Sequence, residues 1–250
     1  MCLKLGEIGN HLIFVADAHQ NRFHNPLPGL FAFLENEIRL QNDFTLILMG
    51  DIFDMLFGGV EYSIKPHQNA INQLKKIAQK RRVYYLEGNH DFNLQPIFSN
   101  MVVIRRENQP AIAECGGVRI ALAHGDFAVN RFYHFYATCI RNPYLLNFLG
   151  GLDVCCKGKI FEQVEKRLQK QKISYFYGLQ KEFIEHRMQL YDSYEVEWIF
   201  EGHYHMQGGF LQKNEKKYVG LPVFYCIQDC FIVKSYNRLF FIYSPIAQGE

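Results

Sequence analysis

Short apolar runs recur along the first 200 positions of the chain, and each ends abruptly in a polar motif. Continuous apolar character over four to six residues is typical of strands that are buried on both faces of a sheet. The predicted strands cover residues 11–16, 44–49, 83–86, 101–104, 118–123 and 196–200. Between them, apolar residues spaced three and four apart predict helices over residues 30–38 and 71–78. This alternation predicts an α/β layered core.

Two other stretches depart from this rhythm. Residues 222–227, 230–236 and 238–244 resemble short consecutive strands with turn signals, which predicts antiparallel pairing late in the fold. Residues 127–195 are mainly helical in pattern, with periodic stretches over 160–173 and 179–191. We therefore expect a core formed by residues 1–126 and 196–250, with residues 127–195 inserted as a helical cap over the functional edge.

Five short motifs rich in histidine, aspartate and asparagine each follow one of the apolar runs. They are Asp17-Ala18-His19, Gly50-Asp51-Ile52-Phe53-Asp54, Gly88-Asn89-His90-Asp91, His124-Gly125-Asp126 and Gly202-His203-Tyr204-His205. In layered α/β sheets, functional residues gather on loops beyond the carboxyl ends of the strands, so all five motifs are expected at one rim. Each motif alone is more often an ordinary turn. The complete ordered set predicts a metal site.

Carboxylate, imidazole and amide oxygen form a mixed O/N ligand set, which suits Mn²⁺, with Fe or Zn²⁺ as alternatives. One carboxylate must bridge two ions, and Asp51 is our choice. Asp91 and Asp126 adjoin residues of ligand type, and we expect them to orient imidazole rings from outside the ligand set. Glycines beside the ligands let the backbone turn sharply where a Cβ would obstruct it.

The motif set from Asp17 to His205 resembles that of the calcineurin-like metallophosphoesterase superfamily. The resemblance implies a β-sandwich flanked by helices and a hydrolase that uses two divalent ions. It implies one ion held by Asp17, His19, Asp51 and His205, and a second held by Asp51, Asn89, His124 and His203. Two such ions activate a water and clamp the phosphoryl oxygens. His90 is then free to stabilise charge or protonate the leaving oxygen, oriented by Asp91; a loop histidine that only satisfies backbone groups is the alternative.

The predicted cap combines aromatic and basic side chains. No acidic residue occurs from Phe127 to Leu152, where seven aromatic residues lie, and a lysine-rich stretch follows. This composition suits an amphiphile with a phosphate head group, or an interfacial helix on an anionic membrane. Ordinary packing of the aromatic residues, with the lysines as a solvated face, is the alternative. The residues expected to contact substrate are Asn89, His90, Arg131, Tyr133, Tyr136, Arg141, Lys157 and Lys159.

The motif spacing, the helical insertion and the element Arg141-Asn142-Pro143 also resemble the bacterial UDP-2,3-diacylglucosamine pyrophosphohydrolase family of lipid A biosynthesis. That resemblance implies a nucleotide-linked lipid substrate, two Mn²⁺ ions, the products UMP and 2,3-diacylglucosamine 1-phosphate, and peripheral association with the inner face of the membrane. One departure is His90, where that family commonly has Arg. A soluble nucleotide phosphodiesterase or phosphoprotein phosphatase of the same superfamily therefore stays open, as does a non-catalytic scaffold.

Composition narrows these readings only slightly. The chain has 250 residues, enough to bury a substantial core, and its net charge of +2 gives no argument for a nucleic-acid partner. No apolar run approaches the roughly 18 residues of a membrane span, and the beginning lacks a signal-peptide pattern. Seven cysteines, an odd number with one adjacent pair and no CxxC spacing, argue against a disulfide framework. We expect reduced thiols in a cytoplasmic protein.

Overall fold

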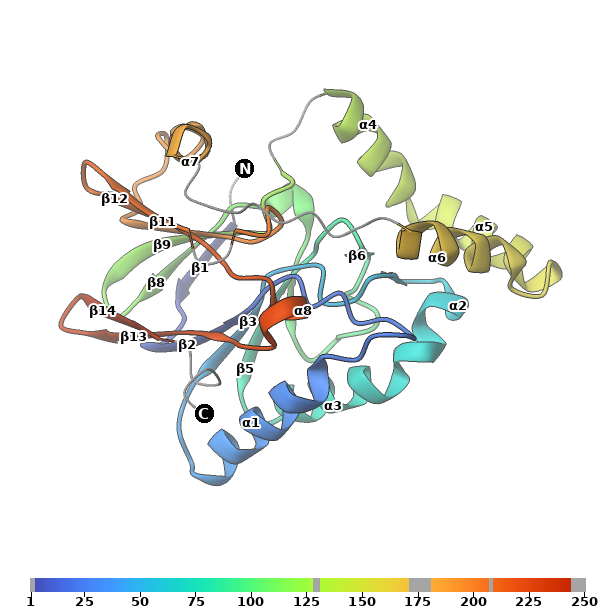
Figure 1. Cartoon of the computed structure of the whole chain (residues 1–250), viewed down its shortest axis with the longest axis horizontal. Helices are drawn as coiled ribbons and strands as arrows, with labels where there is room; N and C mark the ends of the chain where they lie inside the picture. The colour runs from blue at the N-terminus through green and yellow to red at the C-terminus, as the bar shows by residue number, and fades with distance from the viewer. Residues whose placement is uncertain (1–2, 128–130, 171–180, 207–208, 244–250) are drawn as a thin grey trace.

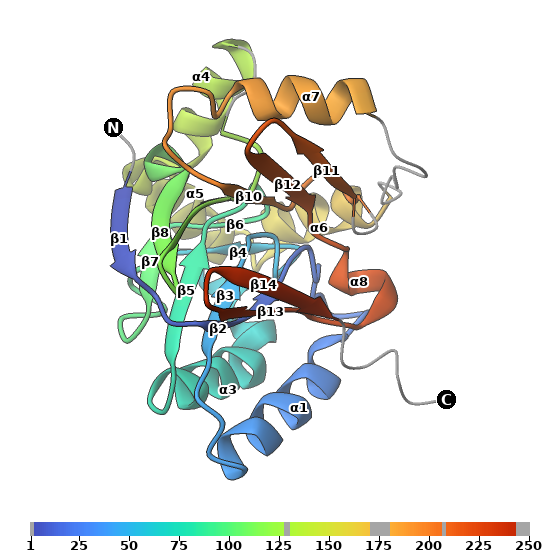
Figure 2. The same ribbon diagram turned by 90° about the vertical axis from the view of Figure 1, so that its left-hand side faces the viewer.

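Two six-stranded sheets face each other in the computed structural model, which describes residues 3–127, 131–170, 181–206 and 209–243 (Figures 1 and 2). The first sheet has the order β14 (Leu239–Tyr243), β13 (Phe231–Tyr236), β2 (His11–Val15), β3 (Thr45–Leu48), β5 (Arg82–Leu86) and β7 (Val102–Ile104). The second has the order β1 (Leu3–Glu7), β8 (Ala111–Cys115), β9 (Val118–Ala123), β10 (Trp198–Glu201), β12 (Lys216–Gly220) and β11 (Phe210–Lys213). A short parallel pair, β4 (Leu56–Phe57) and β6 (Asp91–Phe92), lies outside them.

The period-two alternation of a strand explains why the first sheet is buried on both faces. In β2, Leu12 and Phe14 belong to the core between the sheets, where the Phe14 ring stacks on Phe200 with 4.7 Å between ring centroids. The intervening Ile13 and Val15 belong to a second core, formed with helices on the outer face. The predicted α/β sandwich flanked by helices is confirmed.

Helices cover the outer faces of both sheets. On the first sheet lie α1 (Leu27–Arg39) and α3 (Gln68–Ala78), preceded by α2 (Glu61–Ile64) and a 3₁₀ turn, Lys65–His67. A second 3₁₀ turn is Arg106–Asn108. On the second sheet lies α7 (Lys181–Gln189), whose Ile184 and Met188 pack against Ile199 and Tyr218. The central strands β2, β3, β5, β9 and β10 are thus buried on both faces, as continuous apolar strands require.

Three further helices, α4 (Arg131–Ile140), α5 (Pro143–Cys155) and α6 (Lys159–Lys170), lie together to one side of the sandwich (Figure 1). The Asn142 side chain caps α5 by accepting hydrogen bonds from the N–H groups of Tyr144 and Leu145. Leu146 of α5 and Phe161 of α6 pack with Phe57 of β4. None of the described helices is long and apolar enough to cross a bilayer. The division into core and cap stays a prediction.

Every strand predicted up to residue 200 is confirmed, as are both early helices and the antiparallel pairing of β13 with β14. The predicted strand over residues 222–227 is wrong, because this segment forms the short helix α8 (Phe224–Ile227). The N–H groups of Phe224 and Tyr225 donate to the carbonyl oxygens of Ala16 and Asp17, so α8 closes the end of β2 and does not extend a sheet. Strands β1, β8, β11 and β12 were not predicted, since their short runs include polar or half-exposed positions.

Candidate metal centre

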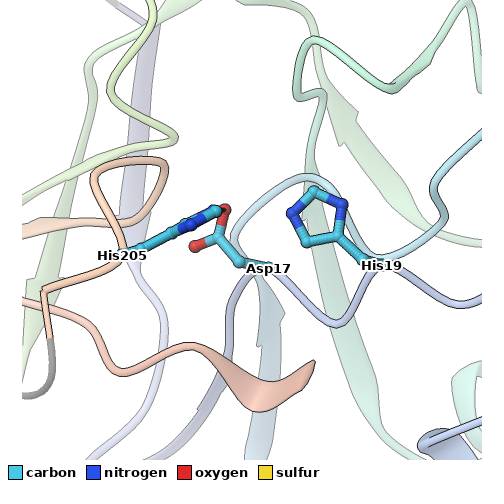
Figure 3. A group of neighbouring side chains, drawn as sticks. All are labelled: Asp17, His19 and His205. Carbon is cyan, nitrogen blue, oxygen red and sulfur yellow. Dashed lines mark ion pairs between the residues drawn. The ribbon is translucent and has the colours of Figure 1, made fainter. Parts of the chain in front are cut away.

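The predicted ligands converge where five parallel strands end. β2, β3 and β5 run parallel in the first sheet, and β9 and β10 run parallel in the second. Their carboxyl ends therefore deliver the motifs to one edge of the sandwich. Potential ligand atoms lie within 4.8 Å of one another in three overlapping groups: Asp17, His19 and His205; His19, Asp51 and His90; and Asp51, His124 and His203. Figure 3 shows the first group, with His19 and His205 on either side of Asp17.

Asn89 joins the same cluster through its amide oxygen. Asn89 Oδ1 lies 3.3 Å from Nε2 of His124, and that nitrogen lies 3.4 Å from Oδ2 of Asp51. All seven side chains predicted as ligands are thus brought together. Two residues, His19 and Asp51, each belong to two of the three groups, and Asp51 is the carboxylate that connects them.

The backbone at the cluster is in an unusual conformation. Five of the seven predicted ligands have positive φ angles between 46° and 66°: Asp17, His19, Asp51, His203 and His205. For residues other than glycine this left-handed region is sparsely populated, and each such residue costs on the order of 1–3 kcal/mol. Backbone hydrogen bonds hold the conformation, among them His19 N–H to Asp51 O at 2.9 Å. Strain of this kind concentrates at functional sites.

Two glycines make room for the cluster. A Cβ on Gly88 would lie 2.1 Å from Oδ1 of Asp51, and a Cβ on Gly50 would lie 2.5 Å from Nδ1 of His124. Gly50 also has a φ of +87°, which other residues rarely adopt. The glycines of the second and third motifs are therefore required by close approach of the ligand side chains.

The hydrogen bonds of the imidazole rings direct one nitrogen of each ring into the cluster. His124 Nδ1 lies 2.8 Å from the carbonyl oxygen of Met49, which can only accept, so Nδ1 carries a proton and Nε2 is the nitrogen that faces the cluster, where a bound cation would replace its proton. His19 Nδ1 lies 3.2 Å from Oδ1 of Asp54, and its Nε2 is buried with no hydrogen-bond partner. An unpartnered buried nitrogen costs free energy, and a divalent ion would satisfy it. The donor set therefore fits divalent metal ions.

Electrostatics in the cluster follow from its burial and its mixed charges. Burial opposes ionisation of Asp51, but the charges of His124 and His90 outweigh it and hold the pKa of Asp51 well below its usual value. Burial likewise disfavours charge on His124, yet Asp51 raises the pKa of His124 to about 10. Burial and the neighbouring His124 lower the pKa of His203 to about 4. The carboxylates thus remain charged and attract cations.

Asp91 does not orient His90, contrary to the prediction. Its carboxylate accepts backbone hydrogen bonds from Asp51 (3.0 Å), Gly88 (2.9 Å), Ile52 (2.7 Å) and Phe53 (3.3 Å), and one from the Tyr85 hydroxyl (2.6 Å). Burial raises its pKa to about 6. Asp91 therefore ties the loop after β3 to the loop after β5.

Asp54 takes the place that was predicted for Asp91. His90 Nδ1 lies 3.0 Å from the carbonyl oxygen of Asp54 and 3.6 Å from its Oδ1, which also contacts His19. Because a carbonyl oxygen only accepts, His90 carries its proton on Nδ1 and leaves Nε2 available. The signal in the sequence was the second aspartate of the motif that begins at Gly50.

Asp126 also differs from its prediction, because it pairs with arginine and not with an imidazole. Arg106 Nε lies 3.0 Å and Arg141 Nη2 lies 3.5 Å from its Oδ2. Arg141 Nη2 also donates to the carbonyl oxygen of Gly88 at 2.8 Å, and its guanidinium lies over the Phe92 ring. Arg141 thus supports the backbone that carries Asn89.

The other residues predicted to contact substrate lie on the cap helices. Tyr136 is exposed on α4, and Lys157 and Lys159 are exposed near the junction of α5 and α6. Arg131 and Tyr133 lie outside the residues whose side chains the structure describes. Substrate contact for these residues stays a prediction.

A buried ion pair behind the centre was missed in the sequence. Arg187 of α7 pairs with Glu201 at 2.7 Å and donates to the carbonyl oxygen of Gly125 at 2.9 Å. Glu201 also accepts from the hydroxyl groups of Tyr191 and Tyr218. This network connects α7 to the segments that carry His124 and His203. Its only sequence signal was a glutamate that ends a buried strand directly before Gly202.

The chain is similar to known proteins over most of its length. The family model for calcineurin-like phosphoesterases matches residues 11–207. UDP-2,3-diacylglucosamine hydrolase of Photorhabdus laumondii is 23% identical over 199 residues, covering 77% of this chain and 81% of that protein. The enzyme of the same name from Wigglesworthia glossinidia brevipalpis is 24% identical over 212 residues, covering 82% and 83%. Among solved structures, a dimetal phosphatase of Danio rerio superposes with a TM-score of 0.50 at 13% identity, covering 94% and 95%.

Proposed function

The chain belongs to the calcineurin-like phosphoesterase family, and on this premise we propose that it hydrolyses the pyrophosphate bond of UDP-2,3-diacylglucosamine. The products would be UMP and 2,3-diacylglucosamine 1-phosphate, an intermediate of lipid A biosynthesis. Family membership makes the chain a hydrolase of phosphoric esters or anhydrides. Relatives that carry the name of this activity, and that align with about four fifths of the chain, support the choice of substrate.

The observation that carries the proposal is the convergence of the seven ligand-type side chains. We assign one ion to Asp17, His19, Asp51 and His205, and a second to Asp51, Asn89, His124 and His203. Two divalent ions, with Mn²⁺ as our choice, would supply an activated water and neutralise charge on the phosphoryl oxygens. The carboxylate of Asp51 would bridge them.

The remaining chemistry belongs to residues around the ligands. His90, with its proton on Nδ1 held by Asp54, presents Nε2 toward the cluster it shares with His19 and Asp51. When protonated, this ring would donate to the oxygen that leaves from phosphorus. Asn89 would contact both an ion and a phosphoryl oxygen. Asp91 would keep the backbone of Asp51 in place, because four N–H groups of the adjoining loops bind its carboxylate.

The lipid end of the substrate is assigned to α4 and α5. These helices expose a group of large apolar side chains: Phe135, Tyr136, Tyr144, Leu145, Phe148, Leu152 and Val154. Phe135, Tyr144 and Phe148 are 72%, 85% and 63% exposed, an apolar surface that water does not favour and that acyl chains would cover. Lys157 and Lys159 follow directly and would contact anionic head groups. We therefore propose peripheral association with the inner face of the cytoplasmic membrane, with no nucleic-acid partner.

The direct test is an assay of the Mn²⁺-loaded protein with UDP-2,3-diacylglucosamine in detergent micelles. Release of UMP, lost on chelation and restored by Mn²⁺, is the expected result. Absence of UMP release from protein that carries its full complement of metal would overturn the substrate assignment.

A second candidate rests on His90, which stands where the UDP-2,3-diacylglucosamine enzymes commonly have Arg. The same metal centre would serve a soluble nucleotide phosphodiesterase or a phosphoprotein phosphatase. Efficient hydrolysis of water-soluble phosphoesters, with no dependence on lipid or detergent, would favour this candidate.

A further inference from the structure

Two aromatic side chains, His24 and Tyr225, lie beside His19 at the border of the metal centre; we refer to them as the aromatic wall. The rings of His24 and Tyr225 lie against each other, with 4.0 Å between their centroids. The Tyr225 ring lies 6.4 Å from the ring of His19. Neither the ligand set nor the proposed acid uses these side chains.

The aromatic wall is built rigidly onto the ligand loops. The Asn21 side chain accepts hydrogen bonds from the N–H groups of Phe23 and His24, both at 2.9 Å, and donates to the carbonyl oxygen of His19 at 3.2 Å. The N–H of Tyr225 donates to the carbonyl oxygen of Asp17 at 3.1 Å. Both halves of the wall therefore keep a fixed distance from the metal centre, and such preorganisation favours binding of a ligand.

The position of the wall distinguishes it from the apolar surface of the cap. Tyr225 lies on α8, which is well separated from α4 and α5 in both Figure 1 and Figure 2. A substrate whose phosphates lie at the metal centre has two organic ends. The acyl chains suit the exposed apolar side chains of α4 and α5. The nucleotide end of the substrate is then expected on the side of the metal centre away from these helices.

We infer that the aromatic wall binds the nucleobase of the nucleotide end of the substrate, by stacking and edge contact with its rings. Every nucleobase has a π-face, and stacking on an aromatic side chain contributes on the order of 1–3 kcal/mol per base. The inference rests on the proposed function, since it assigns one end of the same substrate. It adds a binding site for a planar heterocycle beside the phosphoryl site.

The test compares two phosphates that differ only in the base. UMP and ribose 5-phosphate are titrated separately into the Mn²⁺-loaded full-length protein and followed by calorimetry. UMP is expected to bind more tightly than ribose 5-phosphate by about 5- to 150-fold. Equal affinities for the two ligands would overturn the inference.

Substitutions in the aromatic wall test whether it causes the preference for UMP over ribose 5-phosphate. Tyr225→Ala is expected to remove most of the preference for UMP while leaving the affinity for ribose 5-phosphate unchanged, whereas Tyr225→Phe keeps the ring and the preference. His24→Ala provides a second variant if Tyr225→Ala does not fold. Tyr236→Ala, at an equally aromatic but exposed position of β13, is the matched control and should behave as wild type. A Tyr225→Ala protein that retains the full preference would contradict the inference.

The outcomes separate this inference from the proposed function. If the protein binds UMP more tightly than ribose 5-phosphate, loses this preference in Tyr225→Ala, and yet releases no UMP from UDP-2,3-diacylglucosamine, the nucleobase site is supported and the lipid substrate is refuted. If the protein hydrolyses that lipid with a KM that neither Tyr225→Ala nor His24→Ala changes, the proposed function is supported and the nucleobase site is refuted.

Discussion

The substitution Asp91→Asn should mainly lower the free energy of unfolding. Its effect on proton transfer should be secondary. It replaces one acceptor oxygen by an amide that would face backbone N–H groups, either those of Ile52 and Phe53 or those of Asp51 and Gly88. Hydrogen bonds to a charged acceptor contribute about 1.5–3 kcal/mol each. Loss of two such bonds lowers the free energy of unfolding by about 3–6 kcal/mol, which is a large part of the roughly 5–15 kcal/mol available to a typical domain.

The assay is thermal unfolding of metal-free protein at pH 8, where Asp91 is ionised because its pKa is about 6. For a chain of this size, each kcal/mol shifts Tm by about 2–4 °C, so a fall of roughly 10 °C is expected. Affinity for Mn²⁺ should fall as well, since the carboxylate fixes the backbone of Asp51. Asp54→Asn is the matched control, because Asp54 contacts His19 and His90 without this backbone network; its Tm should change little. If Asp91→Asn kept the wild-type Tm and Mn²⁺ affinity but lost turnover, the argument from the backbone network would be refuted and a role in orienting His90 restored.

Four further outcomes follow from the structure. Asp51→Ala should lose both metal ions as well as activity, since its carboxylate would contact both, and full occupancy by elemental analysis would show that the assignment is wrong. Asn89→Ala and His203→Ala should each empty one position preferentially, leaving about half of the wild-type metal content. Phe148→Ser on the exposed face of α5 should raise KM for the lipid substrate more than for a small chromogenic diester; equal losses would count against an acyl-chain surface. Burial lowers the pKa of His67 from 6.5 to about 4, so the folded protein binds fewer protons than the unfolded chain in this interval, and stability present above pH 6.5 is lost as the pH falls toward 4. Chemical denaturation should measure the free energy of unfolding of wild type and His67→Gln across this pH range. Relative to the variant, the wild type should lose about 3 kcal/mol between pH 6.5 and the acid end. A difference between the two proteins that does not change with pH would contradict the argument.

The sequence predicted the parts of the fold in which both faces of a strand are buried. Such strands, like β3, consist of apolar residues throughout and are visible without tertiary information. Strands with an exposed or small-residue face, such as β8 with the sequence AIAEC, give no comparable signal. The segment that became α8 has the composition of a strand, but hydrogen bonds to the backbone of Ala16 and Asp17 decide its conformation. These bonds join positions more than 200 residues apart, and no local pattern contains them.

The same division applies to the metal centre. The convergence of the candidate ligands could be predicted because each follows a recognisable strand with a glycine or a second polar residue beside it. Their partners could not, because Asp54, Asp91 and Asp126 are all aspartates next to ligand residues and differ only in what lies opposite them in space. Asp91 meets backbone N–H groups, Asp54 meets two imidazoles, and Asp126 meets the guanidinium groups of Arg106 and Arg141.

The predicted ligands are divided between the two sheets. Asp17, Asp51 and Asn89 follow strands of the first sheet, whereas His124 and His203 follow strands of the second. A cation bound by side chains from both sheets would cross-link the sandwich, and its binding free energy would oppose separation of the two sheets. Each tenfold excess of free metal over its dissociation constant then adds about 1.4 kcal/mol against that separation. Removal of metal would therefore lower the stability of the fold as well as the activity.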